Sequence, residues 1–557
     1  MSNHLRDNDD ASRETTSPFR RRRLWLATGV VGLTGAVSLA GVAYATTGAS
    51  GTHRTDLNRS TAQQITRDGA TSGDQNAQDQ ASPDGKVKGG AEGGEVREVP
   101  CDAKELVKAL DLANRDAGGT LKLAKDCTYQ LNRFDKKSGT GLPTIKKDIT
   151  IEGDGSTIKR DSKDAFRIFR VAKNGDLTLK DLTVSSGTAS ESKRKDWKPG
   201  PTAQATPPSW HPHHKDHEGD GGGLLVERGG TAVLKETVFT RNSASDNGGA
   251  IANFGRVEAE NTAVDDNHAG DNGGGIFNAG VLKVTGAGKA ESLISNNTAG
   301  ENGGGIANGE GKHKPKDGKK EDHDRRHDDG KAGNVTVENT RIEGNTAGKN
   351  GGGIFSSGGS VHVTASSIKN NTACENGGGV YAADTHLKLD DVVVEKNHAG
   401  KDGGGVYNTA EERKKNDMQR HGKNKHKGGQ ATITASEILG NSAGRFGGGI
   451  FNGEAKDEKK NEADGKKKKN NATVALVDTT IKDNFAGKNG GGIFNNKGTV
   501  TLTNTSVTEN KAHITGKDHH VAGGIVNVPP GKVTLDATSF VNNNDPKDCV
   551  NVPGCEH

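Results

Sequence analysis

The sequence predicts an all-β protein, a single-stranded parallel β-helix of roughly a dozen coils with a short capping α-helix at its N-terminal end. Three observations predict it. A unit of about 26 residues recurs along the chain, and Thr340–Ser356 shows its fixed half, TRIEGNTAGKNGGGIFS. Apolar residues, mostly Val and Ile, alternate with polar ones in the V-x-V stretch that precedes this half, as in β-strands. Glycine and asparagine return at fixed positions. A unit this short cannot bury a core alone, so successive copies must stack.

Glycine marks each copy of the unit. The chain has 81 glycines in 557 residues, and most copies carry a G-G-G triplet. The last glycine of this cluster lies at Gly249, Gly275, Gly305, Gly353, Gly379, Gly405, Gly449 and Gly492, with degenerate copies at Gly223 and Gly524. Three short strands and three turns fit into the spacing, and strands of neighbouring coils then lie about 4.8 Å apart. The glycines allow turns with positive φ and close backbone packing.

Asparagine occupies two fixed positions of the unit. One column comprises Asn267, Asn297, Asn345, Asn371, Asn397, Asn441, Asn484 and Asn510. The other comprises Asn253, Asn278, Asn308, Asn408, Asn452, Asn495 and Asn527. Stacked asparagine side chains donate and accept hydrogen bonds along a column, so we expect them to satisfy turn amides inside each coil.

The N-terminal segment reads as an export signal. Residues 1–45 contain four consecutive arginines, Arg20–Arg23, then the apolar run Leu24–Ala43 and a small-x-small cleavage pattern ending at Ala45. The arginines are typical of either a twin-arginine signal or an ordinary basic region. The alternative is a retained membrane anchor. Residues 46–96 are polar and Gly-rich and predict a disordered tether.

Residues 97–190 are predicted to hold the helix cap and the first irregular coils. Asp102 and Glu105 form a capping pair that opens a helix through Arg115. Such a helix would cover the backbone edge of the first coil.

The five cysteines predict two disulfides. Cys101 and Cys127 flank the predicted helix and the strand after it, and Cys549 and Cys555 lie near the C-terminus. Export favours both bonds, which would fasten the two ends of the solenoid. Cys374 is the odd cysteine, either an unreactive thiol or a cross-link between two molecules.

The regular repeats occupy residues 221–545, and residues 546–557 form a predicted C-terminal cap. Three charged segments, 310–331, 411–428 and 454–469, enter at one position of the repeat, after G-G-G-I-x-N and before the next V-x-V strand. They therefore emerge from one edge, and their composition predicts disorder. A His- and Pro-rich insertion, 191–220, enters at another turn and is also predicted to be disordered.

The repeat resembles the G-G-A-I and F-x-x-N motifs of polymorphic outer-membrane proteins, which are adhesin-like. Gly351–Ile354 and Phe239–Asn242 carry the closest matches. The whole stretch Cys101–Pro553 also resembles secreted β-helix repeat proteins of the pectin lyase-like superfamily. The resemblance implies right-handed coiling, a secreted or cell-envelope location and, for some relatives, adhesion.

Two functions follow from these observations. The first is an exported, non-enzymatic β-helix protein that binds polymers or surfaces, with cell-wall or extracellular polysaccharide as partner. The alternative is a polysaccharide lyase or glycoside hydrolase of the pectin lyase-like fold. Specific nucleic-acid binding is not expected, because the basic insertions lack interleaved aromatic residues. Membrane contact is expected only if the N-terminal signal is retained as an anchor.

The enzyme alternative depends on three acidic residues. Asp246, Asp271 and Glu301 fall on consecutive coils at the turn before the glycines, where stacked carboxylates would require a cation such as Ca²⁺. No other cofactor is expected. The column continues as Lys349, Glu375, Lys401, Arg445 and Lys488, which is typical of an ordinary solvated turn.

An aromatic column and a histidine cluster are two further candidates for binding. The aromatic residues follow the glycines at Phe277, Phe355, Tyr381, Tyr407, Phe451 and Phe494. They stack on sugar rings if they face outward, and otherwise belong to a core or are covered by the charged insertions. The histidines His211, His213, His214 and His217 lie within reach of one metal ion. Loop histidines usually bind metal adventitiously, so no metal site is expected.

Overall fold

The computed structural model describes residues 95–190, 217–288, 290–309, 331–410, 429–454, 470–513 and 521–555. The predicted export signal, nearly all of the predicted tether and most of the four predicted insertions lie outside these ranges. Within the described ranges, no helix is long and apolar enough to cross a membrane.

The helix α1 (Ala103–Arg115) precedes the coils, as predicted. Its N-cap is Asp102, whose side chain accepts a hydrogen bond from the amide of Lys104 at 2.7 Å. Leu106 and Leu110 are buried against the first coils. Because this apolar face packs on the β-helix core, the helix covers the end of that core.

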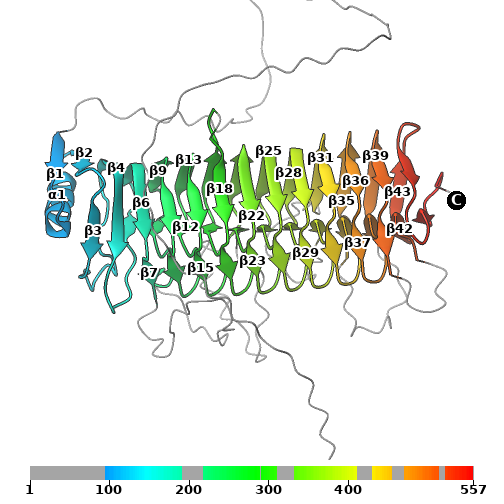
Figure 1. Cartoon of the computed structure of the whole chain (residues 1–557), viewed down its shortest axis with the longest axis horizontal. Helices are drawn as coiled ribbons and strands as arrows, with labels where there is room; N and C mark the ends of the chain where they lie inside the picture. The colour runs from blue at the N-terminus through cyan, green and yellow to red at the C-terminus, as the bar shows by residue number, and fades with distance from the viewer. Residues whose placement is uncertain are drawn as a thin grey trace, which may run out of the picture. The chain divides into compact units, whose positions relative to one another are not determined.

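Each regular coil contributes strands to three parallel sheets (Figure 1). In one coil, β13 (Arg256–Glu260) and β14 (Ala263–Asp265) belong to the wide sheet, β15 (His268–Ala269) to the narrow sheet and β16 (Ile276–Asn278) to the aromatic sheet. Equivalent repeat positions pair in register from coil to coil. The aromatic sheet has 12 strands, so the predicted parallel β-helix of about a dozen coils is confirmed.

The bounds of the strands are as follows. The wide sheet contains β1 (Val96–Val99), β2 (Gly118–Leu123), β3 (Thr128–Leu131), β4 (Asp148–Arg160), β6 (Asp176–Ser185), β9 (Thr231–Lys235), β10 (Val238–Thr240), β13, β14, β17 (Val281–Thr285), β18 (Ser292–Ser295), β21 (Asn334–Glu338), β22 (Thr340–Glu343), β25 (Ser360–Lys369), β28 (His386–Glu395), β31 (Gln430–Thr434), β32 (Glu437–Leu439), β35 (Thr473–Val477), β36 (Thr480–Lys482), β39 (Thr499–Thr503), β40 (Ser506–Thr508), β43 (Lys532–Leu535) and β44 (Phe540–Asn542). The narrow sheet contains β7 (Thr188–Ala189), β11 (Ser243–Ala244), β15, β19 (Thr298–Ala299), β23 (Thr346–Ala347), β26 (Thr372–Ala373), β29 (His398–Ala399), β33 (Ser442–Ala443), β37 (Phe485–Ala486) and β41 (Lys511–Ala512). The aromatic sheet contains β5 (Phe169–Val171), β8 (Leu224–Val226), β12 (Ile251–Asn253), β16, β20 (Ile306–Asn308), β24 (Ile354–Ser357), β27 (Val380–Ala383), β30 (Val406–Thr409), β34 (Ile450–Gly453), β38 (Ile493–Asn496), β42 (Ile525–Val528) and β45 (Cys549–Val550).

The core follows from the alternation of apolar and polar residues along each strand. In β17, Leu282 and Val284 are buried while Val281 and Lys283 are exposed. Since successive side chains of a strand point to opposite faces, one apolar column per coil position enters the core. One cluster of Val, Ile and Leu side chains runs from the helix end to the last coil.

The glycine cluster is required by the turn that enters the aromatic sheet. Gly351 has φ +68°, and a Cβ placed there would lie 2.5 Å from the carbonyl oxygen of Ile354. Any other residue would be strained and would collide with backbone.

The first predicted asparagine column forms a continuous ladder. Nδ2 of Asn345 donates to Oδ1 of Asn371 at 3.0 Å and to the carbonyl of Ile294 at 2.9 Å. The backbone amide of Asn345 also donates to Oδ1 of Asn371 at 3.0 Å. Two members not predicted, Asn242 and Asn544, lengthen the ladder at its ends. The expectation that stacked amides satisfy turn groups is therefore confirmed.

The second predicted column is interrupted. Nδ2 of Asn308 donates to Oγ of Ser356 at 3.0 Å, and the next coil carries Ala382 in this position. Oδ1 of Asn408, which follows Ala382 in register, has no hydrogen-bond partner. The ladder resumes with Asn408 donating to Asn452 at 2.8 Å.

Both predicted disulfides are present, Cys101–Cys127 and Cys549–Cys555. Cys374 is a free, exposed cysteine. The ends of the β-helix differ slightly from the predicted boundaries because pairing extends them. Strand β1 begins at Val96, inside the predicted tether, and β45 continues the last coil to Val550, inside the predicted cap.

Candidate functional site

A charged column runs along the turn between the narrow and aromatic sheets. The amide of Asp271 donates to the carbonyl of Asp246 at 2.9 Å, and the amide of Glu301 donates to the carbonyl of Asp271 at 2.8 Å. The structure thus brings the three predicted acidic residues onto neighbouring coils. The same backbone contacts continue through Lys349, Glu375, Lys401, Arg445 and Lys488.

Ion pairs connect neighbouring members of this charged column. Nζ of Lys349 lies 2.5 Å from Oε1 of Glu301, and Nζ of Lys401 lies 3.0 Å from Oε1 of Glu375. Asp246 and Asp271 are buried. Within the ranges that the structure describes, no three His, Cys, Asp or Glu side chains are grouped so that they could hold a metal ion. Calcium binding and catalysis by the three acidic residues stay predictions.

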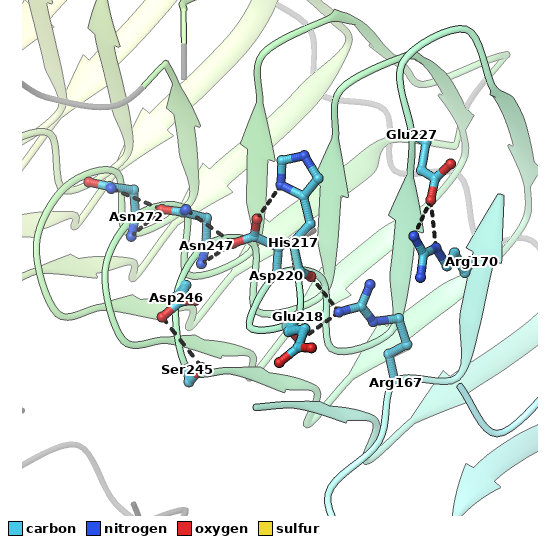
Figure 2. Close-up of polar contacts among 10 residues, drawn as sticks. All are labelled: Arg167, Arg170, His217, Glu218, Asp220, Glu227, Ser245, Asp246, Asn247 and Asn272. Carbon is cyan, nitrogen blue, oxygen red and sulfur yellow. Dashed lines mark hydrogen bonds and ion pairs between the residues drawn. The ribbon is translucent and has the colours of Figure 1, made fainter. Parts of the chain in front are cut away.

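A third asparagine ladder lies one residue after the charged column (Figure 2). Nδ2 of Asn247 donates to Oδ1 of Asp220 at 3.1 Å, and Nδ2 of Asn272 donates to Oδ1 of Asn247 at 2.9 Å. The ladder continues through Asn302, Asn350 and Asn376. Its amides donate toward the N-terminal coils, opposite to the first ladder. It therefore ends on a carboxylate at Asp220, a group that only accepts hydrogen bonds when ionised.

Arg167 holds the chain that returns from the predicted 191–220 insertion. Its Nη2 donates to the carbonyls of His217 and Glu218, both at 2.6 Å (Figure 2). The side chain is buried, and this burial, together with nearby Arg170, lowers the pKa of Arg167 to about 10. Its Nε and Nη1 have no hydrogen-bond partner. Burying the charged guanidinium therefore costs desolvation free energy. In return its hydrogen bonds hold the two residues, His217 and Glu218, that precede Asp220 by two or three positions.

His217 is the one member of the predicted histidine cluster within the described residues. Its Nδ1 lies 2.9 Å from Oδ2 of Asp220, and its ring lies 3.8 Å from the ring of Phe254, centroid to centroid. His211, His213 and His214 lie outside the described residues, so the predicted metal cluster is untested. His217 and Asp220 are ordered residues inside the insertion that was predicted to be disordered throughout. They are ordered because Arg167, Phe254 and the third ladder hold them.

The predicted aromatic column is a stack on the outer side of the aromatic sheet. The rings of Tyr381 and Tyr407 lie 4.9 Å apart, and those of Tyr407 and Phe451 lie 4.6 Å apart, each pair nearly parallel. The isoleucines and valines that precede the rings enter the main core, whereas the rings form two separate clusters. Tyr381 is half-buried, and the other predicted members of the column are buried. Most of the rings thus do not offer a free face to a sugar.

Two features of the site were missed at the level of sequence. The third ladder has a sequence signal, since an asparagine directly precedes the glycine cluster in several coils, as at Asn272 and Asn302, but the two predicted asparagine columns do not include it. The clamp at Arg167 carries no sequence signal, because it lies in an irregular coil and its partners follow 50 and 51 residues later.

A family of repeats matches a short stretch of the chain. Residues 236–253 match the Chlamydia polymorphic membrane protein repeat, and this confirms the predicted resemblance for that stretch. No curated protein matches the chain. Among solved structures, tailspike protein 3 of bacteriophage CBA120 is similar, with 11% identity and a TM-score of 0.36 over 81% of this chain, which spans 59% of the tailspike chain. The chain is a parallel β-helix protein with a stretch, residues 236–253, that is similar to the Chlamydia polymorphic membrane protein repeat.

Proposed function

We propose that this protein is an exported, non-enzymatic β-helix that binds extracellular or cell-wall polysaccharide along its side. The observation that carries the proposal is the charged column. It places one charged residue per coil at the same repeat position over eight coils, from Asp246 to Lys488, and the six side chains from Glu301 onward are half-buried or exposed. A linear array with a regular coil spacing suits a linear polymer with a regular monomer spacing.

The location rests on two observations. The repeat matched at residues 236–253 is named for membrane proteins of Chlamydia. Both ends of the β-helix carry a disulfide, and such bonds persist in oxidising compartments. Together they support a secreted or cell-envelope protein.

The experiment is a sedimentation assay in which the full chain is mixed with purified cell walls and with insoluble polysaccharides. We expect binding that saturates and that is competed by the matching soluble polymer. A second variant lacks the segments 310–331, 411–428 and 454–469. Their flanks lie at one repeat position, between β20 and β21, β30 and β31, and β34 and β35. Unchanged binding would show that the β-helix itself, not these segments, makes the contact. No binding to any wall or polysaccharide would overturn the proposal.

The enzyme alternative is tested in the same samples, because Asp246 and Asp271 are adjacent buried carboxylates. Release of reducing ends is measured with and without Ca²⁺, for the wild type and for Asp271→Ala. Under the binding proposal neither protein releases product. Release that Asp271→Ala abolishes would establish the alternative.

A further inference from the structure

In most coils the wide sheet turns at a single residue with positive φ. At this bend Asn339 has φ +45°, Ala365 +45° and Asp391 +55°, and the register places the three residues on consecutive coils. Asparagine and aspartate suit this conformation because their short polar side chains make local hydrogen bonds. In two later coils, Nδ2 of Asn504 donates to Oδ1 of Asp478 at 2.6 Å. Ala365 adopts the same strained conformation without a side chain that could make such a bond.

A cavity of about 260 Å³ lies beside Ala365 on the outer face of the wide sheet. The flanking coils carry the longer side chains of Asn339 and Asp391 at this bend, whereas Ala365 ends at its methyl group. The small side chain therefore makes room for the cavity. Besides Ala365, its lining includes Glu291, Arg341, Ser367, Asp391 and Val393.

One wall of the cavity comes from a connection that is longer than its equivalent in the preceding coil. Residues 286–291 join β17 to β18, whereas residues 261–262 join β13 to β14. Nδ2 of Asn339, on the next coil, donates to the carbonyl of Ala290 at 3.1 Å and fixes the end of this connection. The residue that follows, Glu291, lines the cavity.

The cavity combines charged groups of both signs with an apolar side chain. Oε2 of Glu291 lies 3.0 Å from Nε of Arg341, so the carboxylate and the guanidinium orient each other. Ser367 pairs in register with Arg341 on one side and with Val393 on the other. Asp391 adds a second carboxylate. Two carboxylates and one guanidinium do not favour an anionic ligand, whereas these groups and a serine hydroxyl suit the hydroxyl groups of a sugar.

We propose that the cavity binds one ring of a neutral polysaccharide chain. The carboxylates of Glu291 and Asp391 accept hydrogen bonds from the sugar hydroxyl groups, and Arg341 donates to the sugar oxygens. Val393 contacts the apolar face of the ring. Three coils line the cavity over about 10 Å, since neighbouring strands lie about 4.8 Å apart. The lining residues named above are exposed or half-buried, so the polysaccharide can continue along the wide sheet. The inference rests on the proposed function and names its ligand class.

The test measures dissociation constants of the full chain for cellohexaose, laminarihexaose and maltohexaose by titration calorimetry. At least one of these neutral sugars should bind. Ala365→Asn fills the cavity with the side chain that Asn339 carries, and should lower the affinity at least about tenfold. Asparagine suits the bend better than alanine does, so this variant should stay folded. Asp391→Ala removes one acceptor and should lower the affinity several-fold, and the bend accepts alanine, as Ala435 shows.

The matched control is Glu236→Asn. It places asparagine at the same bend, with φ +53°, in a coil that does not line the cavity. Because the change lies outside the cavity and the ligand is neutral, the control should bind within about twofold of the wild type. Circular dichroism melts check that all variants remain folded.

Wild-type affinity in either cavity variant, or an equal loss in the control, would overturn the inference. So would a wild type that binds polygalacturonate but none of the neutral hexasaccharides. If the wild type binds cell walls and none of these hexasaccharides, the inference fails and the proposed function stands. If it binds neither walls nor any polysaccharide, both fail.

Discussion

Asn544 donates from Nδ2 to Oδ1 of Asp548 over 2.8 Å, and this contact ends the first asparagine ladder. Every earlier amide of the ladder donates to the asparagine of the following coil. Asn544, the last asparagine, has no following coil, and its amide donates to the carboxylate of Asp548 instead. The third ladder runs in the opposite direction and likewise ends on a carboxylate, at Asp220. Both ladders thus terminate on a residue that accepts hydrogen bonds.

Removing the terminal acceptor should loosen the last coil. Asp548→Ala deletes two hydrogen bonds, from Nδ2 and from the amide of Asn544, and should lower the free energy of unfolding by about 1–3 kcal/mol. Hydrogen exchange should accelerate in β44 and β45 first. Asp548→Asn keeps an acceptor oxygen and serves as the control, with stability close to that of the wild type. Equal losses in the two variants would mean that charge, not acceptance, matters at this position.

The gap in the second ladder is compensated by a second residue. A glycine lies at the coil start beside Asn408, where a Cβ at Gly429 would lie 2.2 Å from the carbonyl oxygen of Thr409 and 2.9 Å from Oδ1 of Asn408. The next coil tolerates Ala472 in this position beside Asn452. Where the asparagine is replaced by Ala382, the matching glycine position holds Thr385. Ala382→Asn alone should therefore overpack the site and destabilise the protein by about 1–3 kcal/mol.

Adding Thr385→Gly should rescue that variant, because the new amide can then donate to Oδ1 of Asn408. A double-mutant cycle measured by denaturant unfolding should give a favourable coupling of about 0.5–3 kcal/mol. The single variant Thr385→Gly supplies the fourth corner. Additive effects would contradict the compensation.

The ion pair between Asp402 and Arg445 predicts that removing the arginine lowers the stability of the protein by an amount that depends on pH. Burial raises the pKa of Asp402 above its ordinary value of 3.8, and Arg445 opposes this shift. Arg445→Met removes the opposing cation and should destabilise the protein by about 3–5 kcal/mol at neutral pH. Since the native pKa is raised, the native state binds more protons than the unfolded chain between pH 3.8 and the native pKa, and stability falls as pH rises through this window. The difference between variant and wild type should accordingly shrink as pH is lowered toward 4.

Unfolding midpoints of Arg445→Met measured from pH 4 to pH 8 test this sign. A double variant with Asp402→Asn should have a flatter profile, because the titrating group is gone. A constant difference across the range would show that the carboxylate does not titrate as argued.

The hydrogen bonds of Arg167 predict that replacing this residue loosens the segment His217–Asp220 without unfolding the other coils. Arg167→Ala removes the donor to the carbonyls of His217 and Glu218 and should cost about 1–3 kcal/mol in total, because these contacts are only part-buried. Faster hydrogen exchange at His217–Asp220 and faster proteolysis there should report release of the segment. Arg241→Ala removes an exposed arginine paired with Asp266 at 3.6 Å and should change neither. If Arg167 does not hold this segment, the two arginine variants should show the same hydrogen exchange and proteolysis at His217–Asp220.

Much of the fold could be predicted from the sequence because each coil repeats the same chemistry. The column of Asn345 and Asn371 was predictable, since one spacing places both at the same turn. The pairing of Cys101 with Cys127 followed from their positions around the cap. The clamp of Arg167 was not predictable, because an irregular coil has no spacing to align it with His217.

The sequence predicted which residues of the candidate site lie on neighbouring coils, but not how deeply their side chains are buried. Placing Asp246 and Asp271 on adjacent coils needs only the repeat length. Their burial depends on neighbouring chain, which no pattern of one residue per coil reveals. The rings of Tyr407 and Phe451 were predicted to fall in one column that either faces outward or is buried, and the structure shows them buried and stacked on each other.

The regular register of the asparagine ladders allows whole coils to be gained or lost without breaking the hydrogen bonds between neighbouring coils. Asn345 and Asn371 are 26 residues apart and make the same bonds to their neighbours on both sides. Recombination between two copies in the gene would remove or add one whole coil and rejoin identical partners. We expect natural variants of this protein to differ by complete coils between fixed ends, each retaining Asp220 and Asp548 as terminators.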